Sequence, residues 1–115
     1  MLIAIVEIPR ATPKPDKEAA VARALGSAPL YRKVDGLIRK DFLNGEEGGG
    51  VYLFESREAA EAWFNDEWWG WIEERFGARP TLKFFDHYVT VDNVGGAVRV
   101  DGEPVKLDDA SEAAE

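Results

Sequence analysis

Two predicted strands carry the residues best suited to acid–base chemistry. His87 is the only histidine of the chain. Imidazole is the one side chain that ordinarily titrates near neutral pH, so His87 is the natural candidate for a general base. Asp86 and Glu7 lie among apolar neighbours, and either could act as a base if it were buried. The structural alternatives stay open: His87 could be a hydrogen-bonded core or interface residue. Each acid could pair with Arg39 or Lys40 across the sheet, or the two acids could face each other.

Aromatic and amide side chains around position 65 could bind a planar ligand. All four tryptophans lie between positions 63 and 71. A stripe at helical spacing predicts that part of this segment packs in the core: Phe64, Trp68, Trp71 and Phe76. Trp63 lies off that stripe, and flat aromatic walls suit a planar ligand. Asn65 could orient a carbonyl or phenol oxygen, although an asparagine here could equally interrupt the helix.

Composition excludes several classes of function. The chain has 115 residues, the usual size of one domain, and it contains no cysteine, so disulfides, thiolate metal sites and a cysteine nucleophile are ruled out. One histidine does not make a multi-histidine metal site, and we expect no metal and no cofactor. The net charge of −8 opposes nucleic-acid binding. The apolar start of the chain is too short for a signal peptide or a membrane span, which predicts a cytoplasmic protein without a membrane partner.

Hydrophobic periodicity and turn residues predict four strands and two helices. The expected strands are 2–8, 37–43, 51–55 and 81–92, and the glycines at 48–50 are expected to form a flexible hairpin. On the second strand, Ile38, Lys40 and Phe42 should share one face, and Leu37 and Arg39 the other. The first helix starts near Asp16 and breaks near Ser27, with an apolar face through Val21, Ala24, Leu25 and Ala28. The second is capped by Ser56 and bends at Asn65-Asp66 or Gly70.

The order β-α-β-β-α-β predicts an α+β fold. Right-handed crossovers give a ferredoxin-like βαββαβ plait, in which a four-stranded antiparallel sheet carries both helices on one face. The strands at 2–8 and 81–92 are apolar on both faces, so the second face needs a cover. A second copy of the sheet is the simplest one, which predicts a homodimer through the sheet faces. Residues 1–92 form this domain, and residues 93–115 add a hairpin at 98–105 and an acidic tail from Asp108.

Several segments carry a resemblance to a known family: Val34–Lys40, Gly48–Glu55, the helix from Ala59 to Trp63, and the strand Lys83–Asp86. Over residues 1–92 the chain resembles the dimeric α+β barrel superfamily, which includes antibiotic-biosynthesis-type monooxygenases. Within it, the chain is most similar to the YdhR-like monooxygenases. The resemblance implies a pocket between the helices and the sheet. It also implies a cofactor-independent monooxygenase that oxidises a small aromatic phenol or quinol with O₂.

The resemblance also implies roles for the candidate residues. His87 or Asp86 would remove a proton from the substrate, and Tyr52 and Asn65 would position it. Further substrate-binding residues would be Trp63, Trp68, Arg39 and Tyr88. Heme-degrading relatives use a histidine on a helix, whereas His87 lies on a strand, so heme degradation is not expected. Two alternatives stay open: a non-catalytic dimeric protein that binds a small molecule, and an isomerase or lyase that uses the same pocket.

Overall fold

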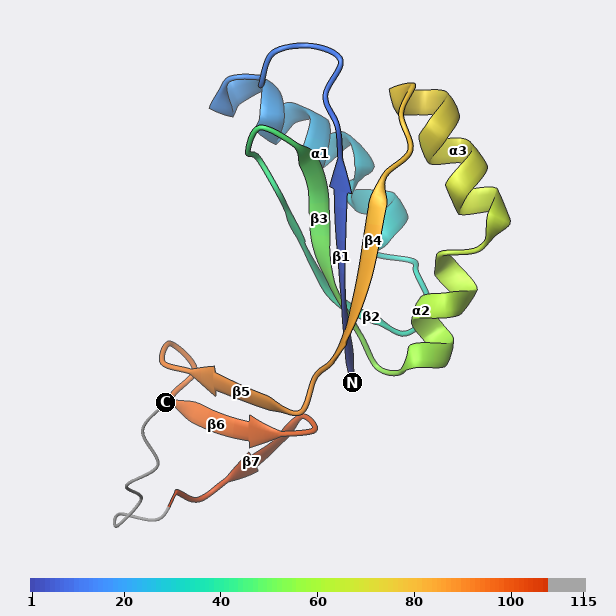
Figure 1. Cartoon of the computed structure of the whole chain (residues 1–115). Coiled ribbons are helices and arrows are strands. Elements are labelled where there is room, and N and C mark those ends of the chain that lie inside the picture. The colour runs from blue at the N-terminus through green and yellow to red at the C-terminus, as the bar shows by residue number, and fades with distance from the viewer. Residues whose placement is uncertain (108–115) are drawn as a thin grey trace.

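The computed structural model describes residues 1–107 and consists of two antiparallel sheets and three helices (Figure 1). In chain order the elements are β1 (Leu2–Ile8), α1 (Lys17–Tyr31), β2 (Leu37–Phe42), β3 (Gly48–Phe54), α2 (Arg57–Trp63), α3 (Asp66–Phe76), β4 (Thr81–Asp86), β5 (Val89–Asp92), β6 (Ala97–Val100) and β7 (Glu103–Val105). The acidic tail predicted from Asp108 lies outside the described residues. No helix within residues 1–107 is long and apolar enough to cross a membrane.

The larger sheet has the strand order β2-β3-β1-β4, and each neighbouring pair is antiparallel. Along β1, buried and half-buried residues alternate, because the helices cover one face of the sheet. This arrangement confirms the predicted α+β class with a four-stranded antiparallel sheet. It is compatible with a ferredoxin-like fold.

The hydrophobic core lies between the covered face of this sheet and helices α2 and α3. It contains alternate residues of β1, two aromatic residues of β3 and residues of both helices: Leu2, Ala4, Val6, Ile8, Tyr52, Phe54, Ala60, Phe64, Trp68 and Ile72. The predicted aromatic stripe therefore packs in the core at Phe64 and Trp68. The other two members of the stripe do not pack in the core, because Trp71 is 38% exposed and Phe76 is 40% exposed.

The aromatic segment forms two helices, which are separated at Asn65, one of the two places where a bend is predicted; α3 continues through Gly70, the other. Ser56 caps α2 by accepting the backbone N–H of Ala59 at 3.1 Å. Asn65 then caps α3, because its side-chain oxygen accepts the backbone N–H of Trp68 at 3.0 Å. These two caps set where each helix begins and how the tryptophans lie over the sheet.

Helix α1 differs from the prediction in two ways. It runs unbroken through Pro29, so the break expected near Ser27 is wrong. Pro29 lies in the last turn, where its missing N–H removes only one helical hydrogen bond. The expected apolar face is also wrong, because Val21 and Leu25 are 46% and 66% exposed, and α1 contains no buried residue.

The register of β2 reverses the expected faces of that strand. A bulge between Leu37 and Arg39 adds one residue to β2. Leu37 therefore pairs with Phe54, and Lys40 pairs with Tyr52, so that both lie on the covered face. The prediction that Leu37 and Lys40 point to opposite faces is wrong.

The glycine run belongs to the sheet and is not a flexible hairpin. β3 begins at Gly48 and pairs with β1 along its whole length, with Gly48 opposite Ile8 and Gly49 opposite Glu7. Gly49 has a φ of 128°, and a Cβ there would collide with the carbonyl oxygen of Val6. Only glycine fits this position.

The strand predicted over 81–92 is two strands in different sheets. β4 ends at Asp86, and β5 pairs with β6, which in turn pairs with β7 in a three-stranded sheet. The hairpin predicted at 98–105 is confirmed, with Asp101 and Gly102 at its turn, both at positive φ. The second sheet thus begins before residue 93 and projects from the end of the first (Figure 1).

Candidate functional site

A cavity of about 480 Å³ opens between α1, α3 and the covered face of the larger sheet. Its floor includes Val6, Ile8 and Tyr52 from the central strands. The loop after β1 and the start of β3 close one end. This volume matches that of pockets that take small organic ligands.

The cavity exists because α1 presents small side chains to it. Ala20, Ala24 and Ser27 recur at helical spacing and line the α1 side of the cavity. Large residues at these positions would fill the space above the sheet, whereas these three leave it open. The opposite wall is aromatic and comes from α3, with Trp68, Trp71 and Phe76. A planar ligand would therefore have apolar faces to pack against.

Lys40 lines this cavity and lies among aromatic rings. Its Nζ lies 3.5 Å from the ring centroid of Tyr31, 4.1 Å from that of Phe42 and 4.8 Å from that of Tyr52. Burial lowers the pKa of Lys40 from 10.5 to about 7. The ring faces favour the charged ammonium and oppose that shift. An amine with such a pKa can accept and return a proton near neutral pH, as a general base does.

Tyr31 and Tyr52 supply hydroxyl groups beside this amine. Burial raises the pKa of Tyr31, against the opposing effects of the Tyr52 side chain and the charge of Arg75. Burial also raises the pKa of Tyr52, and the neighbouring Tyr31 adds to that shift. Both phenols therefore stay protonated at neutral pH. The hydrogen bond between them acts to raise the pKa of Tyr52 and to lower that of Tyr31, so Tyr52 donates to Tyr31, and the Tyr31 hydroxyl is the one left to donate to a ligand oxygen.

A smaller hollow of about 280 Å³ lies beside the first and shares two tryptophans with it. It is lined by Leu30, Trp63, Asn65, Glu67, Trp68 and Trp71. Asn65 offers little to a ligand there, because its oxygen caps Trp68 and its amide donates to the carbonyl of Ala62 at 3.0 Å. The indole N–H groups of Trp63 and Trp68 are buried and have no acceptor among the described residues.

His87 and its neighbours lie away from both cavities, where the chain passes from the first sheet to the second. The His87 ring bonds Thr90 through Nε2 at 2.9 Å, and its backbone N–H donates to Met1 at 2.9 Å. Its Nδ1 is buried without a partner among the described residues. Tyr88 is 61% exposed. His87 and Tyr88 thus connect the sheets and line neither cavity.

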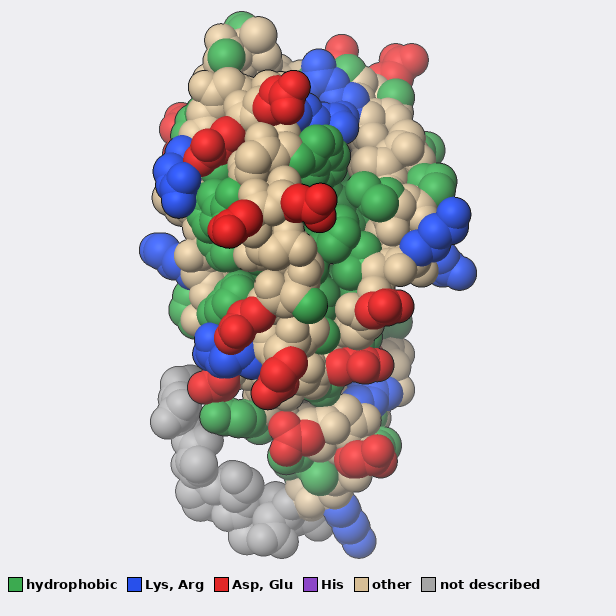
Figure 2. All heavy atoms as spheres, turned by 90° about the vertical axis from the view of Figure 1, so that its right-hand side faces the viewer, with side chains coloured by type: hydrophobic (Ala, Val, Ile, Leu, Met, Phe, Trp, Pro, Cys, Tyr) green, Lys and Arg blue, Asp and Glu red, His purple; other side chains and the backbone are tan. Residues whose placement is uncertain are grey.

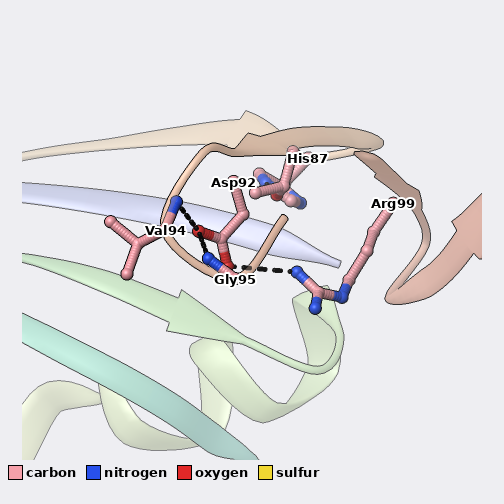
Figure 3. Close-up of polar contacts among 6 residues, drawn as sticks. His87, Asp92, Val94, Gly95 and Arg99 are labelled. Carbon is pink, nitrogen blue, oxygen red and sulfur yellow. Dashed lines mark hydrogen bonds and ion pairs between the residues drawn. The ribbon is translucent and has the colours of Figure 1, made fainter. Parts of the chain in front are cut away.

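The polar cluster near His87 is a turn. Figure 3 draws His87 with Asp92 of β5 and the residues that contact Asp92. The Asp92 carboxylate accepts the backbone N–H groups of Val94 and Gly95 at 3.1 and 2.7 Å, and Arg99 pairs with it at 3.3 Å. The Gly95 N–H and the Arg99 guanidinium lower the pKa of this carboxyl. The cluster closes the β5–β6 connection.

The remaining candidates form surface ion pairs. Asp86 pairs with Arg57 at 3.6 Å, and Arg39 pairs with Asp41 at 2.8 Å. The predicted pairing of Asp86 with Arg39 or Lys40 is therefore wrong. Glu7 and Asp86 do not face each other either, because Glu7 pairs with Thr81 and Asp86 with Leu2, at opposite ends of β1.

Of the candidate residues, the structure brings Tyr52 and Trp68 to the large cavity, and Trp63 and Asn65 to the small one. The sequence analysis missed Lys40, Tyr31 and the helix residues beside them. The available signal was a lysine two positions before Phe42, and so on the same face, of a strand that must bury one face. Within residues 1–107, no group of three or more His, Asp or Glu side chains could hold a metal ion.

In comparisons with known proteins, no family model matches the chain, and no curated protein matches it either. The resemblance to the dimeric α+β barrel superfamily stays a prediction based on residue motifs.

Proposed function

We propose that the protein is a cofactor-independent monooxygenase of a small phenol- or quinol-type aromatic compound, with the large cavity as active site and Lys40 as general base. The observation that carries this proposal is the position of Lys40. Its amine lies among three aromatic rings, at a pocket of ligand size, with a pKa of about 7. A base tuned to neutral pH in an apolar pocket is the group that deprotonation of a phenol-type substrate needs.

In the proposed reaction the neutral amine of Lys40 removes a proton from a substrate such as an anthrone, at the carbon para to its ring carbonyl. The hydroxyl of Tyr31, which accepts a hydrogen bond from Tyr52, donates a hydrogen bond to the oxygen on which the negative charge collects. The resulting anion gives one electron to O₂, and the two radicals combine to a peroxide anion, which takes the proton back from the Lys40 ammonium to give a hydroperoxide. Loss of water then converts the CH₂ group to C=O. One oxygen atom enters the product and the other leaves as water, so the substrate supplies all the electrons.

Lys40 takes the role for which the sequence suggested His87 or Asp86. Lys40 lines the cavity, whereas His87 bonds Thr90 and Asp86 pairs with Arg57 outside it. Trp68 and Phe42 would form walls for the aromatic ring. Asn65 would act as a helix cap.

O₂ uptake with a panel of anthrones, hydroquinones and flavonols tests the reaction. Lys40→Met should lower enzyme-dependent uptake by about 100-fold or more, the usual contribution of a general base. Lys33→Met is the matched control, because Lys33 is exposed and does not line the cavity. No uptake with any compound beyond a no-enzyme autoxidation control would contradict the proposal and favour a non-catalytic binding protein.

We also propose that the protein forms a homodimer through its sheets, as an α+β barrel built on ferredoxin-like plaits. Support comes from the open face of the larger sheet, which carries half-buried or exposed apolar residues on the central strands β1 and β3 and on the edge strand β4: Ile3, Ile5, Val51, Leu53 and Phe85. The second sheet adds a valine face, since the register places five valines on one side: Val89, Val91, Val98, Val100 and Val105. Apolar faces of this kind are typical of interfaces between copies.

Lys40 also favours a second candidate function, carbonyl chemistry of the lyase or isomerase type. A lysine with a lowered pKa in an apolar pocket can attack a carbonyl carbon and form an imine with release of water. Borohydride would reduce that imine to a secondary amine, and mass spectrometry would place the adduct on Lys40. Anaerobic turnover with an adduct would favour this function, whereas O₂-dependent turnover without one would favour the oxygenase.

A further inference from the structure

The charges around the large cavity have one sign. Four basic side chains line it: the guanidinium groups of Arg10, Arg23 and Arg75, and the amine of Lys40, which is only partly protonated at neutral pH because its pKa is about 7. Among the described residues that line the cavity, none is aspartate or glutamate. This is unexpected for a chain with 22 acidic and 14 basic side chains.

The acidic side chains lie on the outside. Figure 2 shows them spread over the face formed by α2 and α3. The exposed acids of these helices are Glu58, Glu61, Asp66, Glu67 and Glu74. The outer surface thus carries acidic and basic side chains together (Figure 2), whereas the residues that line the cavity include basic side chains and no acidic one.

The cavity cations also lack protein partners. The four ion pairs among the described residues use Arg39, Arg57, Arg79 and Arg99, none of which lines the cavity. Arg10 donates to the carbonyl of Gly45 at 3.1 Å, and Arg75 lies 5.6 Å from the ring centroids of Trp71 and Phe76. Neither contact neutralises a charge. Like charges near one cavity repel each other, and an anion bound among them would relieve that repulsion.

The two arginines on the helices flank the cavity from opposite sides. Arg23 belongs to α1, on the side of the small residues, and Arg75 belongs to α3, on the aromatic side. A guanidinium binds a carboxylate through two parallel hydrogen bonds, which gives it geometric selectivity over a simple point charge. The aromatic walls would hold the ring to which that carboxylate is attached.

We infer that the cavity selects planar aromatic compounds that carry a carboxylate, with Arg23 and Arg75 binding the acid group and the aromatic walls binding the ring. This substrate class rests on the cavity being the functional site proposed above, but not on the reaction that occurs there. A bound anion would also favour the ammonium form of Lys40 once the amine has taken up a proton.

Isothermal titration calorimetry with a matched pair of ligands tests this inference. 2-Naphthoate and 2-naphthamide have nearly the same shape and differ in charge. We expect the carboxylate to bind at least tenfold more tightly, a difference of about 1.4 kcal/mol, and this preference should weaken as salt is added. The cation 2-naphthylmethylamine should bind more weakly than the amide.

Variants of the two arginines locate the effect. Arg23→Gln with Arg75→Gln should reduce naphthoate affinity to that of naphthamide and leave naphthamide affinity unchanged. Arg32→Gln is the control, because Arg32 is exposed after the end of α1 and does not line the cavity. Equal affinities of wild type for the acid and the amide would overturn the inference, and so would the absence of binding by both. Because binding is measured without turnover, selective naphthoate binding without O₂ uptake would preserve this inference and reject only the oxygenase reaction.

Discussion

Gly50 gives the side chain of Lys40 its place on the sheet. Gly50 lies on β3 opposite Phe42, and a Cβ at Gly50 would come within 2.7 Å of the Lys40 Cε. The same Cβ would lie 3.2 Å from the carbonyl oxygen of Asp41 and 3.3 Å from the Tyr52 ring, so little room remains. The absence of a side chain at Gly50 therefore leaves room on β3 for the Lys40 side chain, which can then reach the aromatic rings.

Gly50→Ala should displace Lys40 from its rings. We expect an unfolding free energy lower by about 1–3 kcal/mol, as overpacking usually costs, and a marked loss of activity. The pKa of Lys40, followed by NMR of its side chain, should rise towards 10.5 as the amine moves into water.

Gly70→Ala is the control for that substitution. A Cβ at Gly70 meets nothing within 4 Å, and Gly70 lies inside α3. This variant should keep the pKa of Lys40 and gain about 0.5–1 kcal/mol of stability from helix propensity. A Gly50→Ala protein with an unchanged Lys40 pKa would show that the glycine does not position the lysine.

The pKa of Lys40 also predicts how stability depends on pH. Folding lowers this pKa from 10.5 to about 7, so between these pH values the unfolded chain binds more protons than the folded one. The cost of burying Lys40 is therefore fully present below pH 7 and is relieved as the pH rises towards 10.5. Lys40→Met should accordingly be more stable than wild type at pH 6, and its advantage should shrink towards pH 10. Urea unfolding at pH 6, 8 and 10 measures this, and a difference independent of pH would contradict the lowered pKa.

His87 provides a second test of which residue removes the proton. Because His87 lines neither cavity, His87→Ala should keep O₂ uptake within about twofold of wild type. A loss of about tenfold or more, equal to 1.4 kcal/mol of barrier, with unchanged urea stability would return the role of base to His87. Asp86→Asn should behave like His87→Ala, because Asp86 pairs with Arg57 on the surface.

The sequence predicted the parts of the fold that depend on local signals. The helix cap at Ser56, the interruption at Asn65 and the Asp101-Gly102 turn each follow from the chemistry of one or two residues, and each is confirmed. The strand at 2–8 is predicted to be apolar on both faces, so its sequence does not indicate which face the helices cover. Burial shows that the face with Leu2, Ala4, Val6 and Ile8 is the one the helices cover.

The candidate site was harder to predict because it depends on exceptions to periodicity. One added residue in β2 moved Leu37 to the face opposite the predicted one. Side chains alternate along a strand, so a shift of one position moves a side chain to the other face. The cavity exists because Ala20, Ala24 and Ser27 of α1 are small and leave space above the sheet. From periodicity alone, this space would be expected to be filled by larger apolar side chains. The lowered pKa of Lys40 comes from burial, which requires Tyr31 of α1 and Tyr52 of β3 beside the amine, and only the tertiary structure brings these segments together.

The proposed dimer makes a prediction about the open face of the larger sheet. Phe85 lies on β4 opposite Ile3 and is 48% exposed. If a second copy covers this face, Phe85→Glu places an unpaired charge in an apolar interface and should dissociate the dimer. Light scattering would then report a change from twice 12.8 kDa to 12.8 kDa.

Leu25→Glu is the control for the dimer prediction, because Leu25 is 66% exposed on α1, and the helices cover the other face of the sheet. It adds the same charge and should leave the molecular mass unchanged. A wild-type mass of 12.8 kDa at micromolar concentration would contradict the dimer. Dissociation by Leu25→Glu but not by Phe85→Glu would instead place the interface on the helices.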